Sequence, residues 1–217
     1  MRDREELRKA LRDAVDGCWE MVVKTQAFYD QALRAAVHDF YRGDIDAFGF
    51  IDKLVYLVNE QFTRAWNEGM RNLGLDPKTD MEPEWADVLQ ERINQEIGDI
   101  QQFAGDIENA AADKENNPVT PLLARVSMWS NRFNELVSLS MATCGKEKLE
   151  WVVGHTEHCD DCRKLNGCVD YADQWQASGW MPQTTRLACG GYRCQCQLVL
   201  TKRRRSPGGV AGRMDRL

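Results

Sequence analysis

Long apolar runs are missing from this sequence of 217 residues. No segment approaches the ~20 consecutive apolar residues that a membrane-spanning helix needs. The residues that follow Met1, RDREELRKALRD, are mostly charged, so the sequence predicts no apolar signal segment at this end. Apolar residues make up 43% of the chain and charged residues 29%, which favours a soluble globular protein with no membrane partner.

Several enzyme motifs are absent as well. The sequence has no glycine-rich phosphate loop and no H-E-x-x-H pattern, which excludes the common nucleotide-binding and metalloprotease sites. It also lacks the Glu-x-x-His pair with which helical bundles bind two iron ions. We therefore predict a protein that is not an enzyme.

Apolar residues recur every three or four positions in four stretches, 7–42, 48–73, 83–111 and 120–144. This spacing is typical of long amphipathic helices. Short breaks separate them, and Gly43 and Gly74 are the predicted helix ends. Asp44 or Asp46 is expected to cap the second helix, and Pro83 suits the first turn of the third.

The fourth stretch is expected to form one continuous helix. Thr120 would be its N-cap, Pro121 its first residue, and Cys144-Gly145 its end. A cysteine within such an apolar stripe, Cys18 or Cys144, is interpreted as a core residue. The seven tryptophans are numerous for the length, and any exposed ones would suit an interface.

Six of the eight cysteines and two of the three histidines lie between Trp151 and Thr201. Cys159 and Cys162 form a C-x-x-C pair, and a second group, Cys189, Cys194 and Cys196, follows about thirty residues later. Two close-set thiol groups with such a spacer are typical of a tetrahedral zinc site. We predict a structural zinc module.

The ligand set stays open between the five cysteines. Cys159 and Cys162 are expected ligands, together with two of the second group. In an extended strand Cys194 and Cys196 would point to the same face, and Cys189 would join across a glycine turn. Three further candidates are expected not to bind: Cys168, an ordinary half-buried thiol, and His155 and His158, which are expected at the surface or in packing contacts.

Two other chemistries fit the same cysteines. Disulfides are typical of small secreted domains, but a chain of this size has enough core to fold without them. A catalytic zinc site of the deaminase type is the other, since His155-Thr156-Glu157 matches H-x-E. In deaminases the H-x-E and C-x-x-C elements lie well apart and a proline precedes the first cysteine, neither of which is true here.

Short β-prone runs, 149–153 and 197–200, flank the cysteines, and pairing them would bring the two cysteine groups together. We therefore predict a mainly α-helical fold in three parts. Residues 1–145 form an elongated bundle of about four long helices. Residues 146–201 form a small zinc-stabilised α/β-hairpin module, and residues 202–217 a flexible basic tail.

Charge is distributed unevenly along the chain. The net charge is −6, yet six basic residues accompany one acidic residue between Lys202 and Leu217. The cluster Lys202, Arg203, Arg204 and Arg205 would suit nucleic acid or an acidic protein surface. A solvated, disordered end is the other interpretation. The tail therefore supports a second hypothesis, a zinc-ribbon-like protein that binds nucleic acid.

The cysteine-rich region resembles the C-terminal module of phage head morphogenesis proteins of the Mu F-like type. The similar residues, in order, are Trp151, Cys159-x-x-Cys162, Leu165-x-Gly167, Trp175, Gly179, Pro182, Cys189-Gly190-Gly191 and Cys194-Gln195-Cys196. The preceding Phe62-x-x-Ala65-Trp66-x-x-Gly69 stretch is similar in style. Many family members have a histidine in place of Cys189 and an arginine in place of Gln195; a cysteine can replace a histidine ligand.

The resemblance implies a minor capsid protein with a zinc-binding C-terminal module. Such proteins associate in a few copies with the portal protein and the capsid interior, assist head assembly, and help to deliver phage DNA. We therefore expect portal or major capsid protein as the partner, contact with phage DNA as a further option, and a location in the virion, preceded by the host cytoplasm during assembly.

Overall fold

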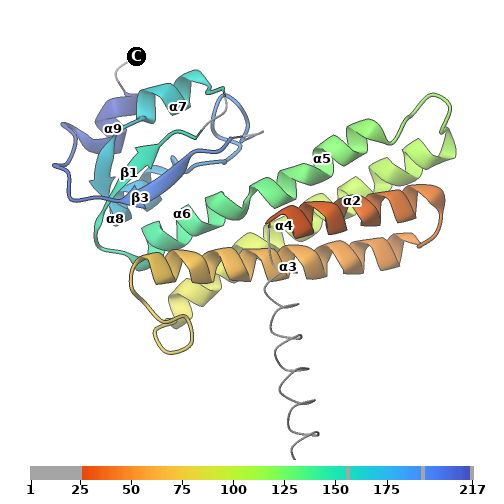
Figure 1. Cartoon of the computed structure of the whole chain (residues 1–217), viewed down its shortest axis with the longest axis horizontal. Helices are drawn as coiled ribbons and strands as arrows, with labels where there is room; N and C mark the ends of the chain where they lie inside the picture. Colours follow the sequence, from red (N-terminus) through yellow and green to blue (C-terminus); the bar gives the residue numbers. More distant parts are fainter. Residues whose placement is uncertain (1–25, 155–156, 192–193, 216–217) are drawn as a thin grey trace, which may run out of the picture.

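The computed structural model describes residues 26–154, 157–191 and 194–215. It is mainly helical, as the sequence predicts, and it has a small antiparallel sheet of three strands where the sequence predicts a hairpin. Figure 1 shows a group of long helices, with the sheet and its short helices at one end of them. Among the described helices, none combines the length and the apolar character that crossing a membrane requires.

The long helices pack side by side. α3 (Ala47–Asn72) contacts α2 (Gln26–Arg42), α4 (Pro83–Ala112) and α6 (Phe133–Cys144), while α2 also packs against α5 (Thr120–Asn131). At 1.5 Å per residue α3, with 26 residues, is about 39 Å long. In Figure 1 α5 and α6 follow one another along the same line.

The predicted helix ends are confirmed where a local residue determines them. Gly43 and Gly74 have φ angles of 88° and 80°, the left-handed region that glycine adopts without steric cost. The Asp46 carboxylate accepts a hydrogen bond from the Gly49 N–H at 2.8 Å and caps α3. Pro83 is the first residue of α4. Residues 7–25 of the predicted first helix, with Cys18, lie outside the described residues.

The prediction of one continuous fourth helix is wrong. The helix is interrupted at Arg132, where ψ is −3°. The Arg132 guanidinium there forms an ion pair with the buried Glu96 of α4, a contact that sequence periodicity does not record. The predicted N-cap is also wrong, because Val119 occupies that position and Thr120 already belongs to α5.

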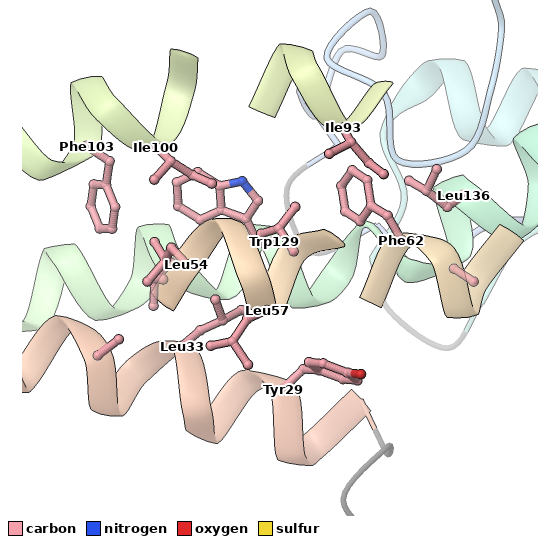
Figure 2. Close-up of a cluster of buried hydrophobic side chains, with 14 of the residues drawn as sticks. Tyr29, Leu33, Leu54, Leu57, Phe62, Ile93, Ile100, Phe103, Trp129 and Leu136 are labelled. Carbon is pink, nitrogen blue, oxygen red and sulfur yellow. The ribbon is translucent and has the colours of Figure 1, made fainter. Parts of the chain in front are cut away.

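The bundle has an apolar core to which α2, α3, α4, α5 and α6 all contribute, and Figure 2 shows part of it. Phe103 and Trp129 lie with ring centroids 5.4 Å apart, and Phe40 stacks on Phe50 at 4.8 Å. The labelled side chains are Tyr29, Leu33, Leu54, Leu57, Phe62, Ile93, Ile100, Phe103, Trp129 and Leu136.

α3 and α6 approach each other closely at Gly69. A β-carbon there would lie 2.6 Å from both Ser140 Cβ and the Val137 carbonyl oxygen. We expect Gly69→Ala to destabilise the bundle by about 1–3 kcal/mol, because the two helices must move apart. Urea unfolding followed by circular dichroism measures this.

Gly98 provides the matched control for this substitution. It is also a glycine inside a long helix, but a β-carbon on it would meet no atom within 4 Å. Gly98→Ala should stabilise the protein by about 0.5–1 kcal/mol, since alanine favours helix. Equal effects of the two substitutions would contradict the close approach of α3 and α6.

The small module is built on a sheet of strand order β2-β1-β3. β1 (Lys148–Val152) pairs antiparallel with β3 (Gln197–Leu200) and with β2 (Val169–Tyr171). The predicted pairing of the two β-prone runs is confirmed; β2, the helices α7 (Asp160–Leu165) and α8 (Ala172–Ser178), and α9 further on were not predicted. Trp151 and Trp175, with ring centroids 5.9 Å apart, are buried in a second hydrophobic core.

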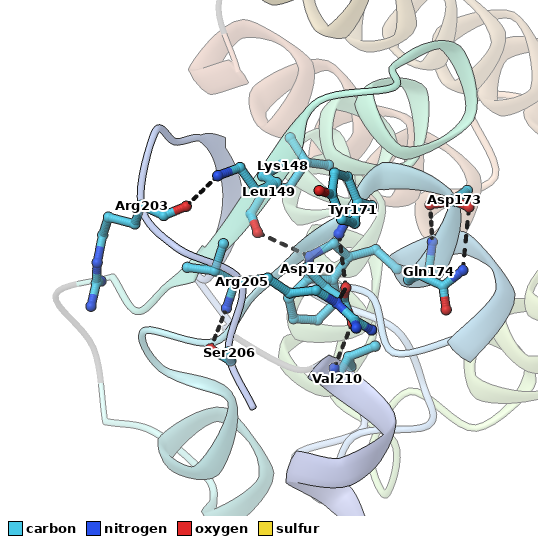
Figure 3. A network of polar contacts seen from close by, with 12 residues as sticks. Lys148, Leu149, Asp170, Tyr171, Asp173, Gln174, Arg203, Arg205, Ser206 and Val210 are labelled. Atoms are coloured by element: carbon cyan, nitrogen blue, oxygen red, sulfur yellow. Dashed lines mark hydrogen bonds and ion pairs between the residues drawn. The ribbon is translucent and has the colours of Figure 1, made fainter. Parts of the chain in front are cut away.

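Residues 202–215 are not a flexible tail. The chain folds back over the sheet and ends in α9 (Gly209–Met214), whose Val210 and Met214 are buried in the second core. Figure 3 shows the polar contacts that hold it. Asp170, only 1% exposed, accepts hydrogen bonds from Arg205 Nε at 2.5 Å and from the Val210 N–H at 2.8 Å. Its basic composition predicted a flexible segment, because composition contains no information on partners far away in the chain.

Asp170 is expected to be the main polar anchor of this segment. Burial raises the pKa of the Asp170 carboxyl. The hydrogen bonds from Arg205 and Val210 together lower it by more than burial raises it, so its pKa lies below the ordinary value. The stabilisation is therefore present above the unfolded-state pKa and is lost as pH falls through the folded pKa. Asp170→Ala should release α9 at neutral pH, at a cost of about 1–3 kcal/mol.

Hydrogen exchange of the amides in α9 measures that release. Asp173→Ala is the matched control, because Asp173 is exposed and its carboxylate accepts hydrogen bonds from the adjacent Gln174 and not from α9 among the described residues. It should leave α9 protected. Unchanged protection of α9 in Asp170→Ala would mean that apolar packing of Val210 and Met214 alone holds the segment.

Candidate metal centre

Five cysteine sulfurs from the two predicted groups converge in the small module. They form two triplets that share one member: Cys159, Cys162 and Cys189, and Cys162, Cys194 and Cys196. Within each triplet all sulfur atoms lie within 4.8 Å of one another. The structure thus brings together all five cysteines that the sequence predicted as candidate ligands.

The first cysteine pair is positioned by α7. Cys159 immediately precedes the helix and Cys162 lies in its first turn, which places their sulfurs 3.4 Å apart. The neighbouring Asp161 carboxylate accepts a hydrogen bond from the Ala188 N–H at 2.7 Å, which ties the two cysteine groups together.

The second group depends on a glycine turn. Gly190 and Gly191 follow Cys189 with φ angles of 60° and 76°, conformations that other residues adopt only with strain. Cys194 and Cys196, two residues apart just before β3, are both buried and both belong to the second triplet. Their sulfurs thus lie close together although neither residue is part of a strand.

Hydrogen bonds between the buried thiols shift their pKa values in opposite directions. The pKa of Cys194 is lowered, first by hydrogen bonds from the Cys162 and Cys196 thiols, and the pKa of Cys162 is raised by the same contacts. A bound cation would deprotonate the thiols that coordinate it.

The donor set fits a tetrahedral soft metal ion. Zn²⁺ binds thiolates at about 2.3 Å, which places the sulfurs of a tetrahedral site about 3.8 Å apart. The Cys159–Cys162 and Cys162–Cys194 separations of 3.4 and 3.9 Å are close to this value. These cysteines could therefore hold a metal ion.

One of the two histidines also contacts the cluster. His158 Nε2 lies 3.1 Å from the Gly154 carbonyl oxygen, and Nδ1 is 3.9 Å from the Cys196 sulfur. The expected packing role fits this position beside the thiols. His155 lies outside the described residues. Cys168 belongs to neither triplet, but it is fully buried where we expected half burial.

The rival chemistries find little support in the geometry. The cysteines of the described segments are free thiols. Cys144 lies in the apolar core of the bundle, as predicted. Glu157, the acid that a deaminase would need, is exposed to solvent, whereas Cys162, Cys194 and Cys196 are buried.

Two of the four residues in the predicted basic cluster form ion pairs within the module. Arg203 forms an ion pair with Glu150, and Arg205 forms one with Asp170, so both guanidinium groups serve the fold. All four side chains are exposed. The ion pairs therefore offset the charge of two of the four cationic groups without covering them.

Two residues that support the site were not predicted. Asp161 links the cysteine groups, and Gln183 donates a side-chain hydrogen bond to the Cys194 carbonyl oxygen. Asp161 lies inside the C-x-x-C motif, a position that could have drawn attention; Gln183 has no sequence signal. Comparisons with protein-family models, curated proteins and solved structures found no match to this chain.

Proposed function

We propose that this chain is a non-enzymatic structural protein of a phage head, a minor capsid or head morphogenesis protein whose C-terminal module is stabilised by zinc. The observation that carries the proposal is the convergence of five thiols from two separate turns. Structural zinc sites are closed by four protein ligands, whereas catalytic sites keep one position for water or substrate. Five thiols are enough to close the coordination sphere of one ion.

The residues of the Mu F-like resemblance have structural roles that agree with this proposal. Trp151, Leu165 and Trp175 are buried in the core of the module. Gly167 and Gly179 adopt φ angles of 72° and 67° at the ends of α7 and α8. These residues stabilise the fold of the module and form no reactive site. A stable fold is what a protein that assembles with other proteins requires.

The long helices offer a surface for such an assembly. Phe48 and Tyr56 are 80% and 63% exposed and lie eight residues apart on α3, so both lie toward the same side of the helix. Exposed aromatic side chains are common anchors of protein interfaces. On this proposal they contact portal or major capsid protein in the assembling head, first in the host cytoplasm and then in the virion.

Isolation of the tagged protein from phage-infected cells tests this function. We expect portal or major capsid protein to be recovered with it in a fixed ratio, together with bound zinc. Phe48→Ala combined with Tyr56→Ala should reduce recovery of the partner and leave the zinc content unchanged. Recovery with nucleic acid and without a head protein would favour the zinc-ribbon-like alternative and contradict the proposal.

A further inference from the structure

Gln183 has an unusual conformation beside the cysteine cluster. It is only 5% exposed and has a φ angle of 65°, and no other non-glycine residue in the described segments has a positive φ. The left-handed region is costly for residues with a β-carbon, so surrounding contacts must hold the residue there. Those contacts connect the two parts of the molecule.

The Gln183 side chain joins the bundle to a cysteine. Its Oε1 accepts a hydrogen bond from the Glu135 N–H at 3.0 Å, and its Nε2 donates to the Cys194 carbonyl oxygen. One residue therefore bonds to the first turn of α6 and to the backbone of a candidate metal ligand.

The bond to Glu135 matters for α6 because its first turn has no local cap. Arg132, the N-cap residue, makes no side-chain capping bond, and the N–H groups of a first helical turn have no partner within the helix. Gln183 supplies this partner from 48 residues away in the chain.

The loop that carries Cys189 packs on the same residue. A β-carbon on Gly191 would overlap the Gln183 carbonyl oxygen, so only glycine fits there. Beside this contact the bundle and the module are separated by a cavity of about 330 Å³, lined by Arg92 and Arg132 on one side and by Gln183 and Gly191 on the other. Elsewhere α6 packs on the module through Met141 and Ala142 and through the hydrogen bond from the Leu198 N–H to Ser138 Oγ. At the start of α6, beside this cavity, the link to the module is the pair of Gln183 side-chain bonds.

We propose that Gln183 couples metal binding at the cysteine cluster to the start of α6. With the ion bound, Cys194 is fixed and holds the Gln183 side chain against the Glu135 N–H. Without the ion, Cys194 is released and the first turn of α6 loses its cap. This inference rests on the proposed metal centre and adds to it a positioning residue that transmits the metal state to the bundle.

Hydrogen exchange of the Glu135 amide, measured by NMR on the full chain with zinc and after chelation, tests the coupling. In the wild-type protein we expect chelation to accelerate exchange at least about tenfold, the effect of losing one hydrogen bond. Gln183→Asn keeps a residue that tolerates the left-handed region but is too short to reach both partners. It should bind zinc normally and show fast Glu135 exchange in both states.

Gln195→Asn, at an exposed position between Cys194 and Cys196, is the matched control and should behave as wild type.

The outcomes separate the coupling from the metal centre itself. A wild-type protein that binds zinc but whose Glu135 exchange is unchanged by chelation would overturn the coupling alone. So would a Gln183→Asn variant in which chelation still accelerates exchange as in wild type. A reduced wild-type protein that binds no zinc would overturn the proposed metal centre, and the coupling with it.

Discussion

Cys162→Ser is expected to abolish metal binding and to unfold the small module. Cys162 belongs to both sulfur triplets, so its loss leaves neither triplet intact. Structural zinc contributes about 10–16 kcal/mol of apparent binding free energy in small zinc domains, and this energy is also folding energy. Metal analysis and hydrogen exchange over β1 and β3 measure the effect, while the long helices should keep most of their circular dichroism signal.

Cys168→Ala is the control for this prediction. Cys168 is buried in the same module but belongs to neither triplet. The variant should keep one metal ion per chain and lose only about 1–2 kcal/mol of stability through packing. Wild-type metal content in Cys162→Ser, with β1 and β3 still protected, would show that the five sulfurs do not act as one site around Cys162.

Glu96→Ala is expected to destabilise the helical bundle by about 3–5 kcal/mol, the usual cost of removing one partner from a buried ion pair. Glu96 is 1% exposed, forms ion pairs with Arg92 and Arg132, and accepts a hydrogen bond from Trp129 Nε1 at 2.7 Å. Its removal leaves only Glu135 to balance two guanidinium groups. Burial, and then the nearby Arg92, already lower the pKa of Arg132 to about 10.

Urea unfolding of the bundle measures this loss, with Glu91→Ala as the control on the same helix. Glu91 is exposed on α4, so its replacement should change the free energy of unfolding by less than about 0.5 kcal/mol. If both variants unfold at the same urea concentration, the buried charges do not organise the junction of α4, α5 and α6.

The features that sequence alone predicted correctly depend on residues close together in the chain or on strict chemistry. Gly43, Gly74 and Pro83 mark helix ends because their backbone preferences are local. The convergence of the cysteines was predictable because two close-set thiol groups are typical of a single shared ion.

The features that the sequence did not predict depend on partners far apart in the chain. The interruption at Arg132 coincides with its ion pair to Glu96, and the ordered C-terminal segment depends on Asp170, which lies 35 residues before Arg205. Gln183 was missed for the same reason, since a lone glutamine in a loop carries no pattern. Periodicity and composition do not encode such pairs.

Zinc content together with X-ray absorption at the zinc edge, on reduced protein purified without added metal, tests the central claim most directly. The account predicts one zinc ion per chain, with four sulfur neighbours at about 2.3 Å. A reduced, folded protein without metal, or a zinc ion surrounded mainly by nitrogen and oxygen, would contradict it.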